Sequence, residues 1–276
     1  MFSEEAMRQA LRHYLLALQF FTRIPVTGRL AAWVGYSPDM LRASSAHFPG
    51  VGWVVGACAA VVYALLYLGL GAAPATPWVA AALSTAATVL LTGGFHEDGL
   101  ADVADGLGGA ASRERALEIM KDSRIGAFGA MALVLALLSK ISLLALLGQR
   151  GLSPALAALA GAHVASRFFP LLLVRSLPYV SDSTRAKAKP LADSITVPQL
   201  WAAAAWCAAP LAVIALGEGA GFVLLALLLS GACSALLARW FLQRLQGFTG
   251  DCLGAVQQTA EIAFYLGAAL ALGPLV

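Results

Sequence analysis

The sequence is short of charge. Asp, Glu, Lys and Arg make up only 12% of its 276 residues, whereas hydrophobic residues make up 60%. A soluble domain carries about 25% charged residues, so this chain has too few to cover a surface that faces water. The shortage excludes an ordinary soluble protein and predicts a chain that lies mostly in lipid.

Cysteine motifs and internal repeats are also lacking, and we expect no cleavable leader. The four cysteines have no C-x-x-C spacing, which argues against a disulfide framework or a zinc site. The first apolar stretch runs on to Arg23 and Pro25 without the small-residue cleavage site of a signal peptide, so we expect the first spans to act as insertion signals. Without a repeat, an inverted-repeat transporter gains no support.

Long apolar runs fill most of the chain. Only helices and closed barrels satisfy every backbone polar group in lipid, and these runs lack the alternation of barrel strands. Each run is near the roughly 20 residues that a helix needs to cross a bilayer. The sequence therefore predicts an all-α, polytopic membrane bundle of about seven transmembrane helices, at 48–70, 78–95, 127–148, 153–175, 199–217, 219–238 and 255–276.

The first 47 residues differ from the rest. Residues 1–24 place charges ahead of a row of leucines and phenylalanines, which is typical of an amphipathic helix in the membrane interface. Residues 25–47 have the composition of a polar connector. We expect a single catalytic domain over 1–276, with 1–47 as an interfacial or cytoplasmic segment and 48–276 as the bundle.

Basic residues predict the orientation. Of the 18 Lys and Arg residues, all but Lys140, Arg150 and Arg167 precede the first span or follow every second one. The positive-inside rule places that side in the cytoplasm, with the N-terminus inside and the C-terminus outside. The loop K-A-K-P-L-A-D at 187–193 on this side either attracts anionic lipid or gates a substrate.

The run H-E-D-G-L-A-D-V-A-D-G-L-G-G at 96–109 is the strongest candidate site. Asp98, Asp102 and Asp105 stand at i, i+4 and i+7, so a helix places the three carboxylates on one face. Their repulsion would be removed by a divalent cation, and carboxylates suit Mg²⁺. The run predicts a Mg²⁺ site whose glycines admit a diphosphate, and the alternative is a solvated loop with incidental acidic residues.

Polar residues also open the third predicted span, in L-E-I-M-K-D-S-R-I-G-A-F-G at 117–129. Lys121 and Arg124 can bind phosphate oxygens, and Asp122 can complete a metal shell or orient Arg124. The alternative is a charged anchor at the membrane interface.

The segment G-F-T-G-D-C-L-G at 247–254 places Asp251 at the cytoplasmic mouth of the last span, either as a phosphate or metal contact or in an ordinary glycine-rich loop. Ionisable groups within spans usually face a cavity or a partner. Glu261 and Arg167 are therefore expected to pair or to bind substrate, while Lys140 is either a buried partner or a side chain that snorkels.

In these motifs the chain resembles the cobalamin synthase (adenosylcobinamide-GDP ribazoletransferase) family. The matching pieces are F-F-T-R-I-P at 20–25, F-P-G-V-G at 48–52, G-G-F-H-E-D-G-L-A-D-V-A-D-G at 93–106, the segment at 117–129, S-R at 166–167 and T-G-D-C-L-G-A at 249–255. The family often has a Glu where this chain has Gln258, whereas Glu261 matches a second family Glu.

The resemblance implies a Mg²⁺-dependent enzyme of the bacterial cytoplasmic membrane. Adenosylcobinamide-GDP reacts with α-ribazole, or its 5′-phosphate, to give adenosylcobalamin, or its phosphate, and GMP. The expected partners are these substrates and membrane lipid, with a homo-oligomer left open and no nucleic acid.

For this reaction the ribose 3′-hydroxyl of α-ribazole would attack the phosphorus that bears the cobinamide, and GMP would leave. We expect Asp98, Asp102 and Asp105 to hold Mg²⁺ on the diphosphate. The candidate general bases are Asp105, Asp122 and His96. The candidate substrate-binding residues are Lys121, Arg124, Arg167, Asp251, Glu261 and Glu97.

Two other functions remain open. A CDP-alcohol phosphotransferase of lipid synthesis also displaces a nucleoside monophosphate from an Asp-rich helix, but its pattern has Ala-Arg after the second Asp, where this chain has Val103-Ala104-Asp105. A transporter could use Lys140, Arg167 and Glu261 as a relay, although the motif residues concentrate at the cytoplasmic side.

Overall fold

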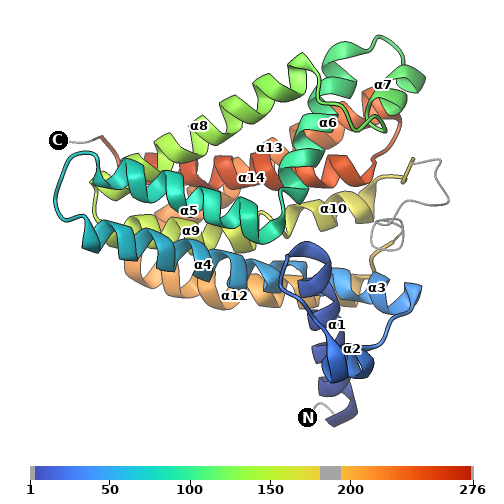
Figure 1. Cartoon of the computed structure of the whole chain (residues 1–276), viewed down its shortest axis with the longest axis horizontal. Coiled ribbons are helices and arrows are strands. Elements are labelled where there is room, and N and C mark those ends of the chain that lie inside the picture. The colour runs from blue at the N-terminus through green and yellow to red at the C-terminus, as the bar shows by residue number, and fades with distance from the viewer. Residues whose placement is uncertain (1–3, 181–193, 275–276) are drawn as a thin grey trace.

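Helices make up nearly all of the structure, and most run side by side between the two ends of a bundle (Figure 1). This computed structural model describes residues 4–180 and 194–274. Within those ranges no named strand forms, and Tyr179 and Phe248 make an isolated β-bridge. The predicted all-α membrane bundle is confirmed.

Each predicted span is helical. In chain order they are α4 (Phe48–Gly69), α5 (Thr76–Thr92), α8 (Ala127–Gln149), α9 (Leu152–Ala165) followed by α10 (Phe169–Ser176), α12 (Val197–Glu218), α13 (Ala220–Leu245) and α14 (Gly250–Ala271). The span expected at 153–175 is thus two helices. Among the described residues, 5 helical segments are long and apolar enough to cross a membrane, or 6 if the bent pair of α5 and α6 counts as one. The expected number of about seven is therefore approximate.

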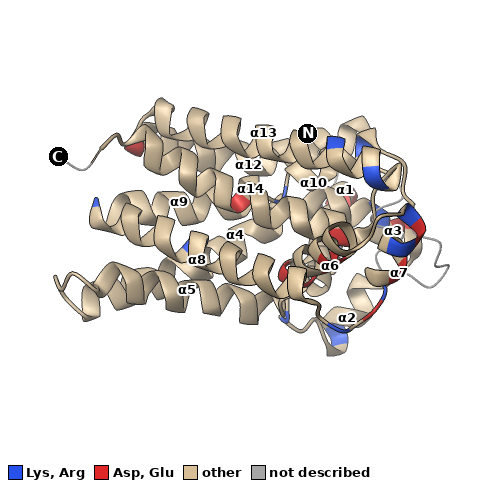
Figure 2. Ribbon diagram, turned by 90° about the horizontal axis from the view of Figure 1, so that it is seen from above, with Lys and Arg blue, Asp and Glu red and all other residues tan. Residues whose placement is uncertain are grey.

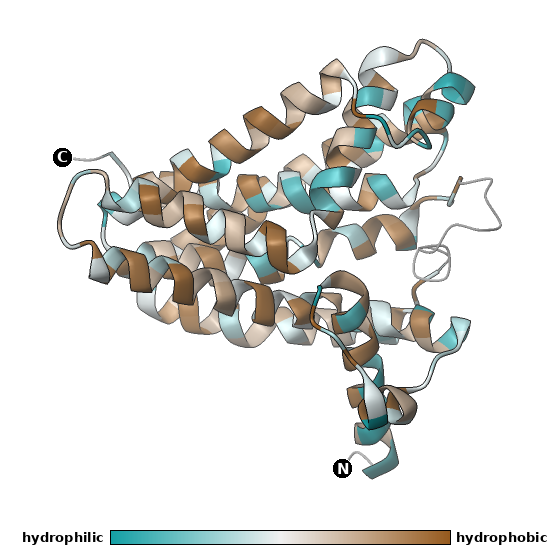
Figure 3. Ribbon diagram, in the orientation of Figure 1, coloured by the Kyte–Doolittle hydropathy of each residue, from teal (hydrophilic) through white to brown (hydrophobic). Residues whose placement is uncertain are grey.

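The last predicted span, α14, is not among those segments, and most of it lies inside the bundle. It contacts α13, α6, α8, α9 and α10, and its Gln257, Gln258 and Glu261 are buried. A helix surrounded by protein does not need an apolar surface toward lipid. The outer helices carry that surface instead: Leu135 of α8 and Leu216 of α12 are exposed. Hydrophobic residues, brown in Figure 3, are found all along these helices.

Charged residues gather at the end of the bundle that carries α3, α6 and α7 (Figure 2). Arg150, at the turn between α8 and α9, lies at the other end, where its guanidinium donates a hydrogen bond to the carbonyl of Gly273 after α14. The separation agrees with the charge distribution read from the sequence. The basic loop predicted at 187–193 lies outside the described residues.

The N-terminal segment is more ordered than the predicted polar connector at 25–47. It forms α1 (Glu4–Phe21), α2 (Gly28–Val34), α3 (Pro38–Ser44) and a 3₁₀ turn, η1 (Ser45–His47). Ser37 starts α3 by accepting a hydrogen bond from the backbone N–H of Met40, and Pro38 follows in the first turn, where it is tolerated. The expected polar connector thus contains short helices, and these capping signals begin α3.

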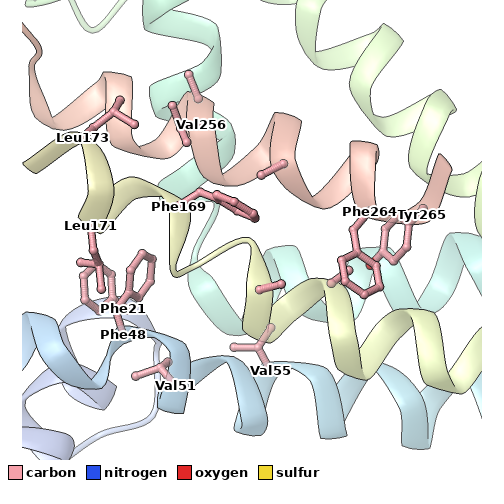
Figure 4. Packing of buried hydrophobic residues seen from close by; sticks show 14 of the residues in the cluster. Phe21, Phe48, Val51, Val55, Phe169, Leu171, Leu173, Val256, Phe264 and Tyr265 are labelled. Carbon is pink, nitrogen blue, oxygen red and sulfur yellow. The ribbon is translucent and has the colours of Figure 1, made fainter. Parts of the chain in front are cut away.

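Aromatic packing attaches α1 to the charged end. Phe21 of α1 stacks on Phe48 of α4 with ring centroids 4.1 Å apart, and Leu171 of α10 lies beside them (Figure 4). Leu16 and Leu18 are buried as well. The second half of α1 therefore packs on protein, and it also lines cavities at this end of the bundle.

Candidate active site

The acidic run lies on α6 (Phe95–Gly109), which begins at a sharp bend. The axes of α5 and α6 differ by 91°. Gly93 and Gly94 both have φ of +69°, a left-handed conformation that side chains disfavour. Their N–H groups bond to the carbonyls of Leu90 and Val89 and close the end of α5. The bend turns the acidic run away from the direction of α5.

Close packing between α6 and α14 brings Asp251 to this run. A Cβ at Gly99 would lie 2.8 Å from the carbonyl oxygen of Asp251, and one at Gly254 would lie 3.1 Å from that of His96. The two helices therefore approach through glycine. Across this contact the negative charge of Asp251, in the first turn of α14, acts on Asp102.

Asp98, Asp102 and Asp251 form what we call the acidic cluster. Asp98 is exposed, the other two are partly buried, and the three carboxylates repel one another. Within the described ranges, no group of three His, Cys, Asp or Glu side chains is placed so that it could bind one metal ion. Mg²⁺ is usually held by one or two carboxylates together with waters and substrate phosphates. The cluster has the hard oxygen donors for that mode of binding.

Asp105, the third aspartate of the run, binds backbone N–H groups at the start of the neighbouring helix α8. Its Oδ2 accepts a hydrogen bond from the N–H of Gly126 at 2.7 Å, and its Oδ1 accepts one from the N–H of Gly129 at 2.8 Å. A Cβ at either glycine would collide with this carboxylate. Asp105 thus satisfies N–H groups at the start of α8, which accounts for the two glycines of the 117–129 motif. Its expected part as ligand or base stays a prediction.

Two cavities meet at the acidic cluster. The bend cavity, of about 700 Å³, lies under the α5–α6 bend, and Arg23, Asp98 and Asp102 are among its lining residues. The N-terminal cavity, of about 990 Å³, lies against α1, α2 and α3, and its lining includes Tyr36, Asp98 and Asp251. Asp98 therefore borders both. The N-terminal segment supplies walls that the sequence analysis did not assign to the site.

The basic residues expected to bind phosphate do not line either cavity. Lys121 and Arg124 are exposed on the loop after α7 (Arg113–Ile119). Arg124 Nη2 lies 2.6 Å from Asp122 Oδ2, and hydrogen bonds from Arg124 lower the pKa of Asp122 to about 2. Asp122 is therefore ionised at neutral pH and already balances the charge of Arg124. From this loop Ser123 reaches the bend cavity.

A buried polar network lies beside the acidic cluster. Glu97 accepts a hydrogen bond from Gln258 Nε2 at 3.0 Å, and Gln257 links Gln258 to Glu261. Lys140 Nζ of α8 lies 2.9 Å from Glu261 Oε1 and 4.0 Å from Glu97 Oε1. Lys140 is thus a buried partner and does not snorkel. Gln258 and Gln257 together link the two carboxylates.

Arg167 was expected to pair with Glu261 or to bind substrate. Its guanidinium contacts His163 and Phe48. Its Nη1 donates to the carbonyl oxygen of His163 at 2.8 Å, and its guanidinium lies 5.7 Å from the ring centroid of Phe48. It is buried and lines neither cavity. Among described residues, Arg167 Nε is one of a few buried polar atoms without a hydrogen bond, as is Glu97 Oε2.

His96, a candidate base, also lies away from the two cavities. Its ring stacks on Phe48 at 5.7 Å and on Phe21 at 6.2 Å between centroids, and only 2% of the residue is exposed. Its Nε2 has no hydrogen-bond partner among the described residues. The aromatic packing gives His96 a structural place at the start of α6.

The fold and the site together define a class: a helical protein with several membrane-crossing helices and a carboxylate-lined site at one end. Comparison with known families then identifies the member of that class. The family model described as cobalamin-5-phosphate synthase matches residues 13–269, so the chain belongs to the cobalamin-5-phosphate synthase family. The family resemblance drawn from the motifs is confirmed. The chain is thereby placed among the transferases of cobalamin synthesis.

Curated relatives share nearly the whole length. The proteins of Polaromonas naphthalenivorans (strain CJ2) and Albidiferax ferrireducens are 60% and 59% identical to this chain, over 96% of it and 100% of each relative. That of Leptothrix cholodnii is 50% identical over 95% of this chain and 96% of the relative. All three are named adenosylcobinamide-GDP ribazoletransferase. No solved structure matches the chain.

Proposed function

We propose that this chain joins adenosylcobinamide-GDP to α-ribazole, or to its 5′-phosphate, and releases GMP. The product is adenosylcobalamin or its 5′-phosphate. The structural observation that supports the proposal is the acidic cluster at the junction of two cavities, where Asp98 borders both. The name shared by the relatives supports the same reaction.

The reaction exchanges one phosphate ester for another. The 3′-hydroxyl oxygen of α-ribazole forms a bond to the phosphorus that bears the cobinamide. The bond from that phosphorus to the bridging oxygen breaks, GMP leaves with the electron pair, and the hydroxyl proton passes to a base. Such a transfer depends on holding the two reactants in line. Two cavities that converge on Asp98 allow donor and acceptor to approach one point from different sides.

We infer that Mg²⁺ takes part, held by Asp98, Asp102 and Asp251. Their oxygens suit this ion, and their mutual repulsion favours a cation between them. When bound, Mg²⁺ would neutralise charge on the diphosphate and on the leaving nucleotide. The chain itself contributes the carboxylates, the glycine contact between α6 and α14 that brings them together, and walls that limit access of water.

We further propose that the chain spans the bacterial cytoplasmic membrane with the acidic cluster toward the cytoplasm, the N-terminus inside and the C-terminus outside. The gathering of basic residues at the cluster's end supports this orientation. Exposed leucines on α8 and α12 supply the surface that contacts lipid.

The proposal is tested with purified protein in detergent. Adenosylcobinamide-GDP, α-ribazole 5′-phosphate and Mg²⁺ are added, and GMP and the corrinoid product are both measured. We expect equal amounts of the two products, loss of both with EDTA, and recovery with excess Mg²⁺. If monodisperse, folded protein forms neither product, the proposed reaction is wrong.

A further inference from the structure

Arg23 stands out among the residues around the acidic cluster. Within the described residues it is the only Lys or Arg that lines either the bend cavity or the N-terminal cavity. Its side chain is exposed, and among described contacts its guanidinium makes no ion pair or hydrogen bond. The cation is therefore available to a ligand in the cavity that also contains Asp98 and Asp102.

The backbone around Arg23 is held firmly. Thr22 Oγ1 donates to the carbonyl of Leu18 at 2.7 Å and accepts from the N–H of Ile24 at 3.2 Å. The N–H of Arg23 donates to the carbonyl of Leu91 in α5 at 2.7 Å. These bonds attach the end of α1 to the end of α5, immediately before the bend.

The side chain of Arg23 lies across that bend. A Cβ at Gly93 would collide with the Arg23 guanidinium, so a larger residue there would displace the Arg23 side chain. Gly93, Arg23, Asp98 and Asp102 all line the bend cavity. One cation thus shares a cavity of about 700 Å³ with carboxylates suited to a metal ion.

We propose that Arg23 binds the diphosphate of the nucleotide substrate in the bend cavity. A guanidinium matches phosphate oxygens with paired hydrogen bonds, and the cavity is in the size range of small-molecule sites. The inference rests on the proposed function and names the residue that holds the donor's phosphates. Lys121, Arg124 and Arg167 are less suitable, because none of them lines the cavity.

The test compares Arg23→Ala and Arg23→Lys with the control Arg29→Ala. Arg29 is also exposed but lies on α2 and lines neither cavity. The loss of charge-assisted hydrogen bonds predicts a rise of roughly tenfold to a hundredfold in the KM for adenosylcobinamide-GDP in Arg23→Ala. The KM for α-ribazole 5′-phosphate should stay unchanged, Arg23→Lys should fall between, and the control should match the wild type.

Equilibrium binding of GMP in the presence of Mg²⁺ gives a second readout, which does not need turnover. GMP affinity should fall in Arg23→Ala by a similar factor, and thermal unfolding in detergent shows whether each variant is folded. An unchanged GMP affinity in folded Arg23→Ala overturns the assignment of Arg23, as does an equal rise in both KM values. Wild-type protein that binds GMP but forms no product contradicts the proposed reaction and leaves the Arg23 comparison intact.

Discussion

At the scale of single residues, aspartates on one face of α6 have different surroundings. Asp98 and Asp102 border the bend cavity, whereas Asp105 binds the backbone of Gly126 and Gly129. The i, i+4, i+7 spacing predicted the shared face, but α6 packs on α8 as well as on α14. Which neighbour each carboxylate meets depends on that packing, which the spacing of residues does not encode.

The two kinds of aspartate should respond differently to substitution by asparagine. Asp102→Asn removes a charge from the acidic cluster, so turnover should fall to background at normal Mg²⁺ while the unfolding temperature is kept or raised, because repulsion is relieved. Asp105→Asn replaces one acceptor by an N–H donor opposite a backbone N–H. That variant should lose about 1–3 kcal/mol of stability.

Mg²⁺ titrations of turnover and thermal unfolding in detergent distinguish these outcomes. Asp39→Asn, in an exposed ion pair with Arg42, is the control and should resemble the wild type. A folded Asp105→Asn protein of normal stability whose turnover needs far more Mg²⁺ would show that Asp105 is a ligand after all.

At the scale of elements, the bend between α5 and α6 is the feature on which the site depends. Sequence analysis placed a span at 78–95 and a helical acidic run after it, and both are present as α5 and α6. The turn of 91° between them was not predicted. Two adjacent glycines are a signal for such a turn, but after the turn α6 packs against α14, which lies far away in the chain.

Gly93 and Gly94 form a matched pair for testing the bend. Both have φ of +69°, so alanine at either position should cost about 1–2 kcal/mol in conformational strain. Nothing lies within 4 Å of a Cβ at Gly94, whereas one at Gly93 would displace Arg23. We therefore expect similar losses of thermal stability, with a clearly larger rise in the KM for adenosylcobinamide-GDP in Gly93→Ala. Equal KM values in the two variants would contradict this account.

At the scale of the whole molecule, the buried polar network joins four helices at the centre of the bundle. Glu97 comes from α6, Lys140 from α8 and Glu261 from α14, and His163 of α9 joins them with its Nδ1 3.6 Å from Glu261 Oε2. The side chains of Lys140 and Glu261 are only 2% and 3% exposed. Removing one partner of such a pair leaves an uncompensated buried charge, which costs more than the pair contributes.

Lys140→Met should accordingly lower stability by about 3–5 kcal/mol. The double variant Lys140→Met with Glu261→Gln removes both charges and should recover much of that loss. Ser139→Ala, at a partly exposed position on the same helix, is the control. Thermal unfolding in detergent measures all three, and a double variant no more stable than Lys140→Met would rule out charge pairing as the cause.

Residue types and their order in the chain were enough to predict insertion into a membrane, the helical ranges, the charged end and the family, because each follows from local composition, periodicity or motif. The contacts that build the site were not predictable in that way. Asp251 reaches Asp102 through a glycine contact between helices, Arg23 crosses the bend at Gly93, and Lys140 pairs with Glu261. Each contact joins residues far apart in the chain, and only the packing of helices brings them together.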